Sequence, residues 1–219
     1  IRQGRVTVNS RRATLGERAD LERDLVELDG VRIRPEGRKT YLLMNKPRGV
    51  LTTMSDPQGR PKVTDLVKTR GKVFPVGRLD TDTEGFLILT NDGDLAHRLT
   101  HPSFEVEKTY VAEVEGAVSP DTLRALREGI SIGSGRPARA VRARVRESRR
   151  GRSPKTVLEI TLHEGRRHVV RRMMEEVGHP VVRLVRTKVA GLGLGRLRPG
   201  EYRELTPVEV VELSRRVRP

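Results

Sequence analysis

The sequence predicts an α+β protein, in which a mixed but mainly antiparallel sheet is flanked by helices and preceded by a short N-terminal unit. Strand-like alternation of apolar and polar residues recurs along the chain, as in residues 105–115 and 156–163, between shorter helical segments. An apolar run over residues 86–90 is typical of a buried strand. The length of 219 residues suits one medium-sized domain with a small appendage.

The chain is strongly basic, with a formal net charge of +15, and it has no cysteine. The charge favours a polyanionic partner, most simply nucleic acid, over an acidic membrane surface, for which no basic amphipathic helix is found. The lack of cysteine excludes disulfides and thiolate metal sites. No apolar run is long enough to span a bilayer and no signal-peptide pattern is found, so we expect a cytoplasmic protein without a membrane partner.

The N-terminal unit is predicted from two alternating stretches, residues 6–9 and 25–28, of which the second is followed by an Asp-Gly turn. Residues 35–39 contain proline and glycine and predict a linker. We therefore expect one domain over residues 1–36 and a second over residues 37–219.

The second domain opens with a predicted strand over residues 40–45, which ends in a turn containing Lys46 and Pro47. The proline stiffens this turn, so we interpret it mainly as architecture. Thr64 is expected to cap a short helix that runs to Lys68. Residues 72–76 predict the next strand.

The central stretch, residues 76–85, is a polar loop that leads directly into the buried strand. It holds one arginine and three carboxylates: Arg78, Asp80, Asp82 and Glu84. A polar loop at the edge of a rigid strand is a usual place for chemistry, whereas a solvated acidic turn is the alternative.

Helix and strand signals continue after this loop. Asp94 is expected to cap a helix over residues 95–99, and Ser119 with Pro120 predicts a helix that ends near Gly129. His97 and His101 have the spacing of helical metal ligands, but no third ligand lies near them, so no metal site is expected. Between these helices, Tyr110 lies in the predicted strand 105–115.

Arginines crowd residues 139–155, and over residues 140–145 they alternate with small apolar residues. A strand would present them on one face, and we favour contact with an RNA backbone over a merely solvated face. The next strand, residues 156–163, leads into a predicted basic helix over residues 164–174, which stops at Gly178. The remaining predicted elements are a strand over residues 181–189 and a last helix opened by a Thr206 capping box.

The stretch Gly77-Arg78-Leu79-Asp80-x-Asp82-Thr83-Glu84-Gly85, with the apolar run and Thr-Asn-Asp-Gly that follow, resembles the catalytic signature of the RsuA/RluB family of ribosomal RNA pseudouridine synthases. Three further family motifs are similar to Lys-Pro-x-Gly at residues 46–49, Lys-x-Tyr at residues 108–110 and the basic segment at residues 165–172. In the last, Val169 stands where the family has glutamine. The resemblance covers about residues 1–212.

The resemblance implies the pseudouridine synthase fold and an isomerase that needs no cofactor, metal, redox step or energy input. Asp80 is implied as the catalytic carboxylate, which attacks the anomeric carbon or stabilises positive charge there. Arg171 is expected to pair with Asp80 and keep it ionised. Tyr110 is expected to stack on the uracil, and Leu184 to form a wall of the pocket.

The partner implied is ribosomal RNA, with the target uridine extruded from its stack. Asp82 and Glu84 are expected to shape the loop, and Arg78 to fill the space that the uridine leaves. The residues expected to contact RNA are Arg78, Lys46, Arg142, Arg144, Arg146, Arg166, Arg167 and Arg172.

The N-terminal unit is similar to the second half of an S-four-type RNA-binding domain, whose first two helices would precede Ile1, so we expect it to be truncated. A generic hairpin appendage is the alternative. Residues 99–108 look closer to the RluB-type large-subunit enzymes, and we expect a monomer. The sequence leaves three alternatives. They are a small-subunit enzyme, a hydrolytic glycosidase with Asp82 as its second carboxylate, and a non-catalytic RNA-binding ribosome-assembly protein.

Overall fold

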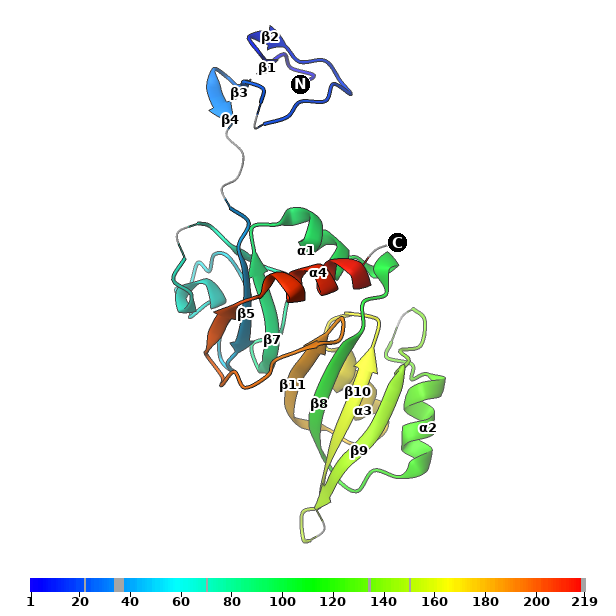
Figure 1. The fold of residues 1–219 in the computed structure, drawn as a ribbon. Helices are drawn as coiled ribbons and strands as arrows, with labels where there is room; N and C mark the ends of the chain where they lie inside the picture. The colour runs from blue at the N-terminus through cyan, green and yellow to red at the C-terminus, as the bar shows by residue number, and fades with distance from the viewer. Residues whose placement is uncertain (22, 34–37, 70, 134, 150, 218–219) are drawn as a thin grey trace. The chain divides into compact units, whose positions relative to one another are not determined.

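The computed structural model describes residues 1–21, 23–33, 38–69, 71–133, 135–149 and 151–217. The chain divides into two compact units, residues 1–39 and 40–219 (Figure 1). Most of the linker predicted at residues 35–39 lies outside the described residues. Within the described ranges, no helix has the length and apolar character needed to cross a bilayer.

The N-terminal unit is a small antiparallel sheet. Its strands are β1 (Val6–Val8), β2 (Arg11–Arg12), β3 (Val26–Leu28) and β4 (Val31–Ile33), in the order β2-β1-β3-β4. The predicted turn between β3 and β4 has positive φ at both Asp29 (53°) and Gly30 (77°), as a tight two-residue hairpin requires. Val8 and Val26 supply its buried apolar core.

The larger unit is built on a nine-stranded sheet, with β12 and β6 attached beside a main path of β13-β5-β7-β11-β8-β10-β9. Among the described strand pairings of this sheet only β7 with β11 is parallel, which confirms the mixed, mainly antiparallel prediction. The strands are β5 (Tyr41–Lys46), β6 (Phe74–Pro75), β7 (Thr83–Thr90), β8 (Lys108–Glu115), β9 (Arg142–Arg149), β10 (Lys155–Leu162), β11 (Val181–Val189), β12 (Leu192–Gly193) and β13 (Tyr202–Glu204).

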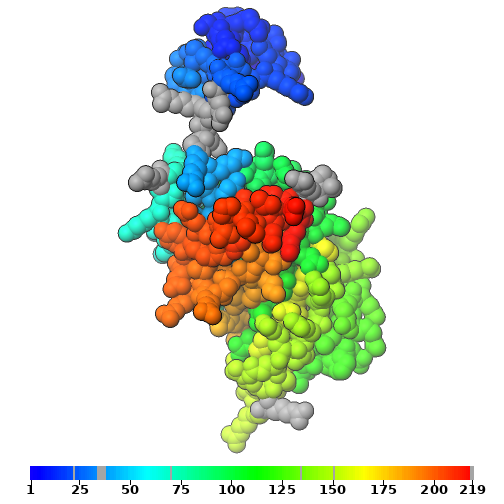
Figure 2. Space-filling model, viewed as in Figure 1, coloured from blue at the N-terminus to red at the C-terminus, as the bar shows by residue number. Residues whose placement is uncertain are grey.

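Helices lie on both faces of this sheet. The helices are α1 (Gly93–Thr100), α2 (Pro120–Glu128), α3 (Val169–Glu176) and α4 (Pro207–Arg216), and 3₁₀ turns occur at Val63–Leu66 and Pro102–Phe104. Helices α2 and α4 begin where predicted: Ser119 caps α2, and Thr206 forms the capping box of α4. Figure 1 shows α4 crossing in front of β5 and β7, and Figure 2 shows the same helix in red at the surface.

The alternation of side chains in β7 divides the core into two clusters. Leu87 and Leu89 pack with residues of α2, α3, β8 and β10, whereas Phe86 and Ile88 pack with residues of α1 and α4. Both faces of β7 are therefore covered, which explains its continuous apolar sequence. By contrast, β10 buries alternate residues over most of its length, as a strand with one covered face does.

Three predicted helix boundaries are wrong. The helix expected after Thr64 is only a 3₁₀ turn, and the cap of α1 is Asp92, whose carboxylate accepts the Leu95 N–H, rather than Asp94. The basic helix starts at Val169, because His168 before it has a left-handed conformation (φ 55°). Residues 164–168 therefore form a loop.

The parallel pairing of β7 with β11 requires a residue without a side chain at position 85. Gly85 has φ +112°, and a Cβ atom there would lie 2.2 Å from the carbonyl oxygen of Arg186. We predict that Gly85→Ala lowers the free energy of unfolding by more than about 2 kcal/mol in urea denaturation. Gly59→Ala is the matched control, because Gly59 also has positive φ (+68°) but nothing lies within 4 Å of the added atom. Equal losses in the two variants would contradict the steric argument.

Candidate active site

The loop between β6 and β7 carries the predicted carboxylate and is anchored through its backbone. The Thr52 hydroxyl donates to the Leu79 carbonyl oxygen at 2.8 Å, and the Gly49 N–H donates to the Thr81 carbonyl oxygen at 2.7 Å. The Thr83 N–H donates back to the Asp80 carbonyl oxygen at 3.1 Å. The backbone at Asp80 is therefore fixed from both sides of the loop.

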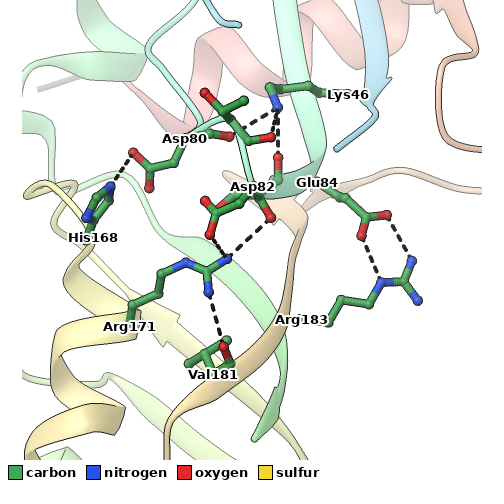
Figure 3. Close-up of polar contacts among 10 residues, drawn as sticks. Lys46, Asp80, Asp82, Glu84, His168, Arg171, Val181 and Arg183 are labelled. Atoms are coloured by element: carbon green, nitrogen blue, oxygen red, sulfur yellow. Dashed lines mark hydrogen bonds and ion pairs between the residues drawn. The ribbon is translucent and has the colours of Figure 1, made fainter. Parts of the chain in front are cut away.

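Lys46 is the main anchor of this loop. Its ammonium group donates to the carbonyl oxygens of Asp80 (3.1 Å), Thr81 (3.4 Å) and Thr83 (2.9 Å) (Figure 3). It also donates to the carbonyl oxygen of Pro47 at 3.1 Å. Lys46 has no exposed surface. The prediction that Lys46 contacts RNA is therefore wrong, because its ammonium group is buried and hydrogen-bonded to backbone carbonyl oxygens, three of them in the loop.

The Asp80 carboxylate is about one-third exposed and faces a histidine rather than an arginine. Its Oδ1 lies 3.1 Å from Nε2 of His168 (Figure 3). The predicted pairing of Asp80 with Arg171 is wrong: Nη2 of Arg171 lies 2.7 Å from Oδ2 of Asp82. Arg171 also donates to the carbonyl oxygens of Asp82 and Val181, at 3.3 Å each. Arg171 thus holds the loop to the start of β11.

Glu84, the third carboxylate of the loop, makes a two-pronged ion pair with Arg183 of β11. Both hydrogen bonds measure 2.9 Å, and they lower the pKa of Glu84 (Figure 3). Asp82 and Glu84 therefore each connect the start of β7 to a neighbouring element. Among the described residues, Asp80 differs from them in making no ion pair with an arginine.

A cleft of about 920 Å³ opens beside Asp80. Tyr110 of β8 and Leu184 of β11 are buried in its wall, and Arg78 lines it as an exposed side chain. Neighbouring strands bring these residues together. Leu184 of β11 pairs with Thr83 of β7 on one side and with Ala112 of β8, two residues after Tyr110, on the other. The structure therefore gathers Arg78, Asp80, Tyr110 and Leu184 around one cleft, which Arg166 and Arg167 also line.

The other arginines expected to contact RNA lie outside this cleft. On β9 they are exposed but paired: Arg142 with Glu107 (2.7 Å), and Arg144 and Arg146 with Glu159 (2.7 and 3.8 Å). Arg172 donates to the carbonyl oxygen of Ile132. Arg166, which does line the cleft, pairs with Glu164. Arg150, which was part of the predicted arginine cluster, lies outside the described residues.

His168, Lys108 and Arg186 also line the cleft, and no role was predicted for them from the sequence. Arg186 is only 5% exposed, and its Nε donates to the Phe86 carbonyl oxygen at 2.9 Å. Burial, with a smaller effect from Arg186, lowers the pKa of Lys108 to about 8. The sequence did hold a signal for Arg186, because it lies two residues after Leu184 in the same strand and so shares its face.

Comparison with known proteins identifies the fold and the chemistry. Residues 40–176 match the family model for RNA pseudouridylate synthases. The chain belongs to this family. It is 47% identical over 222 residues to an uncharacterized RNA pseudouridine synthase of Mycobacterium tuberculosis (strain ATCC 25618 / H37Rv), covering 99% of this chain and 86% of that protein. It is 41% identical over 215 residues to the ribosomal large subunit pseudouridine synthase B of Bacillus subtilis (strain 168), covering 97% and 86% of the two chains.

A solved structure agrees with this assignment. The crystal structure of a pseudouridylate synthase matches with a TM-score of 0.72 at 30% sequence identity, covering 97% of this chain and 90% of that one. The expected pseudouridine synthase fold is thus confirmed, and the protein is an isomerase that acts on RNA.

Lys46 leads to a prediction for the pH dependence of stability. Burial lowers its pKa from 10.5 to about 8, although the nearby carboxylates of Asp82, Asp80 and Glu84 oppose this shift. Between pH 8 and pH 10 the unfolded chain therefore binds more protons at Lys46 than the folded chain does, and the free energy of unfolding rises with pH. We expect about 2 kcal/mol of this rise to come from Lys46.

The measurement is urea denaturation at pH 8 and pH 10 for the parent, Lys46→Met and Lys72→Met. Lys72 is exposed, so its variant should keep the parent's increment. Lys46→Met should lose about 2 kcal/mol of the increment, while the contribution of Lys108 remains in all three proteins. An unchanged increment in Lys46→Met would contradict the argument.

Proposed function

We propose that this enzyme converts a specific uridine of large-subunit ribosomal RNA into pseudouridine, with Asp80 as the catalytic carboxylate. The observation that carries the proposal is the position of Asp80, whose partly exposed carboxylate borders a cleft walled by Tyr110 and Leu184. The assignment to large-subunit RNA is supported by the similarity to the ribosomal large subunit pseudouridine synthase B of Bacillus subtilis. A small-subunit target is the second candidate.

The reaction breaks the bond between N1 of uracil and C1′ of ribose and joins C5 to the same carbon. The proton on C5 is lost and N1 gains one, so no net oxidation or reduction occurs. A carboxylate beside C1′ attacks that carbon or stabilises the positive charge that develops on the sugar. Because the backbone of the Asp80 loop is anchored at several carbonyl oxygens, the carboxylate is held in place before substrate binds.

Other residues of the cleft suit the handling of an extruded base. We assign Tyr110 to stacking on the uracil, Leu184 to the apolar wall beside it, and Arg78 to the space that the uridine vacates. Arg171 acts as a positioning residue through its ion pair with Asp82. Contact with the RNA backbone falls to the half-buried Arg166 and to the exposed arginines, namely Arg78, Arg142, Arg144, Arg146, Arg167 and Arg172.

The N-terminal unit has a place in this proposal as an RNA-binding module. We assign residues 1–36 to a partial S-four-type domain and residues 37–219 to the catalytic domain. Support comes from the exposed arginines on the strands of the small unit, Arg11, Arg12 and Arg32.

Release of tritium from C5-labelled uridine in ribosomal RNA tests the catalytic assignment. We predict that Asp80→Asn, which preserves shape but removes the charge, lowers the rate by about 10³-fold or more. Binding of the RNA should change little, since only one partly exposed charge is removed.

Asp121→Asn is the matched control, because Asp121 is an exposed carboxylate on α2 that pairs with Arg124 of the same helix. This variant should release label at the parent's rate. Carbodiimide mapping of the parent's product then locates the uridine and decides between the large and small subunit. Full activity in Asp80→Asn would refute the assignment of the carboxylate.

The role of the N-terminal unit is tested by the salt dependence of RNA binding. Arg32→Glu should weaken binding and reduce the slope of log K against log salt concentration by about 1. The rate at saturating RNA should stay at the parent's value. Arg124→Glu makes the same charge change at an exposed site on α2, and an equal effect there would show that the unit has no special role.

A further inference from the structure

Two cations, Lys108 of β8 and Arg186 of β11, line the catalytic cleft without a carboxylate partner among the described residues. Each uses one N–H group on a backbone carbonyl: Lys108 donates to Val106 at 3.0 Å, and Arg186 donates to Phe86 at 2.9 Å. Their remaining N–H groups meet no acceptor within the part of the chain that the structure describes. Charged groups this deeply placed are usually paired.

The two cations also disfavour each other. Burial and the neighbouring Arg186 both lower the pKa of Lys108, which means that its charged form is held against an opposing environment. Arg186 also lowers the pKa of a third cation, Lys46. The ammonium group of Lys46, however, already donates to carbonyl oxygens of the loop that carries Asp80. An anionic or strongly electronegative ligand in the cleft would relieve this repulsion.

The surroundings of the two cations indicate what kind of ligand fits. The same cleft is lined by the buried apolar side chains of Phe86, Ile88, Leu99 and Val189. Apolar walls with a few placed polar groups suit a flat ring that carries carbonyl oxygens. A phosphodiester, which stays in contact with water, is better matched by the exposed Arg78 and Arg167, which also line the cleft.

We propose that Lys108 and Arg186 form an oxyanion site that stabilises the negative charge on the carbonyl oxygens of uracil when the base leaves the ribose. This inference rests on the proposed function. When the N1–C1′ bond breaks, its electron pair stays with the uracil, and the charge spreads over N1 and the ring oxygens. This charge is neutralised when C5 bonds to C1′, after which C5 loses its proton and N1 gains one. The negative charge on uracil therefore exists only between the breaking of the N1–C1′ bond and the formation of the C5–C1′ bond.

The experiment compares single-turnover rates at saturating RNA for transcripts that contain uridine or 5-fluorouridine, scored by formation of the carbon-linked nucleoside. Fluorine stabilises the uracil anion itself, so bond breaking in that RNA depends less on the protein's cations. Lys108→Met should lower the rate on uridine by about 100-fold, which is the scale of losing one oxyanion donor. On 5-fluorouridine the same variant should lower the rate by about 10-fold or less. Lys108→Arg and Arg186→Lys keep the charge and should keep the parent's ratio of the two rates.

Equal losses on the two RNAs would overturn the inference and assign the pair a structural role. If Lys108→Met binds the RNA more weakly but keeps the parent's rate at saturating RNA, the inference is also overturned. The two cations would then be assigned to binding a phosphate of the RNA. If Lys108→Met does not fold, Lys108→Gln removes the charge while keeping a donor for the Val106 carbonyl. If the parent is inactive, the proposed function has failed. If the parent is active, Asp80→Asn is inactive and Lys108→Met keeps the parent's ratio of the two rates, only this inference has failed.

Discussion

The burial of one ammonium group, that of Lys46, determines the geometry of the loop that carries Asp80. Removing a charge from water is costly, and backbone carbonyl oxygens satisfy it only if they converge on the same point. Three of the four carbonyl oxygens around Lys46 belong to the segment from Asp80 to Thr83. The loop must therefore curl around the end of β5 in the conformation that presents the Asp80 side chain to the cleft. The lowered pKa of Lys46 shows that the carbonyls and nearby carboxylates compensate only part of the desolvation.

The parallel contact between β7 and β11 supplies the second constraint. It places the start of β7 beside Leu184, and it is possible only because Gly85 lets the two backbones approach. Three charged contacts then connect the loop and β7 to residues near or within β11. They join Arg171 to Asp82, Arg183 to Glu84, and Arg186 to the Phe86 carbonyl oxygen. The carboxylates that flank Asp80 are thus used in holding the chain, which leaves Asp80 available to a substrate.

Much of this arrangement could be predicted from the sequence, because strand periodicity, caps and the motif around Asp80 are local signals. The prediction of β11 over residues 181–189 is confirmed at both ends, and so is the start of α4 after Thr206. Partner choice could not be predicted in this way. Asp80 and Asp82 are two residues apart on one loop, so only the final direction of each side chain decides which of them meets Arg171. Lys46 misled for a similar reason, since a lysine at a turn is ordinarily exposed, and only the convergence of distant carbonyls makes its burial tolerable.

The distribution of charge in the cleft fits the electronic demand of the proposed isomerisation. When the glycosidic bond breaks, positive charge develops on the ribose and negative charge on the base, so one uniform electrostatic environment would stabilise only one of the two fragments. Here the carboxylate of Asp80 comes from the loop before β7, whereas the cations of Lys108 and Arg186 come from β8 and β11. Separate elements of the sheet therefore present opposite charges to one cleft. A base detached from the ribose can then stay within the enzyme while it turns, because it exchanges its covalent bond for contacts with fixed cations and apolar walls rather than for water.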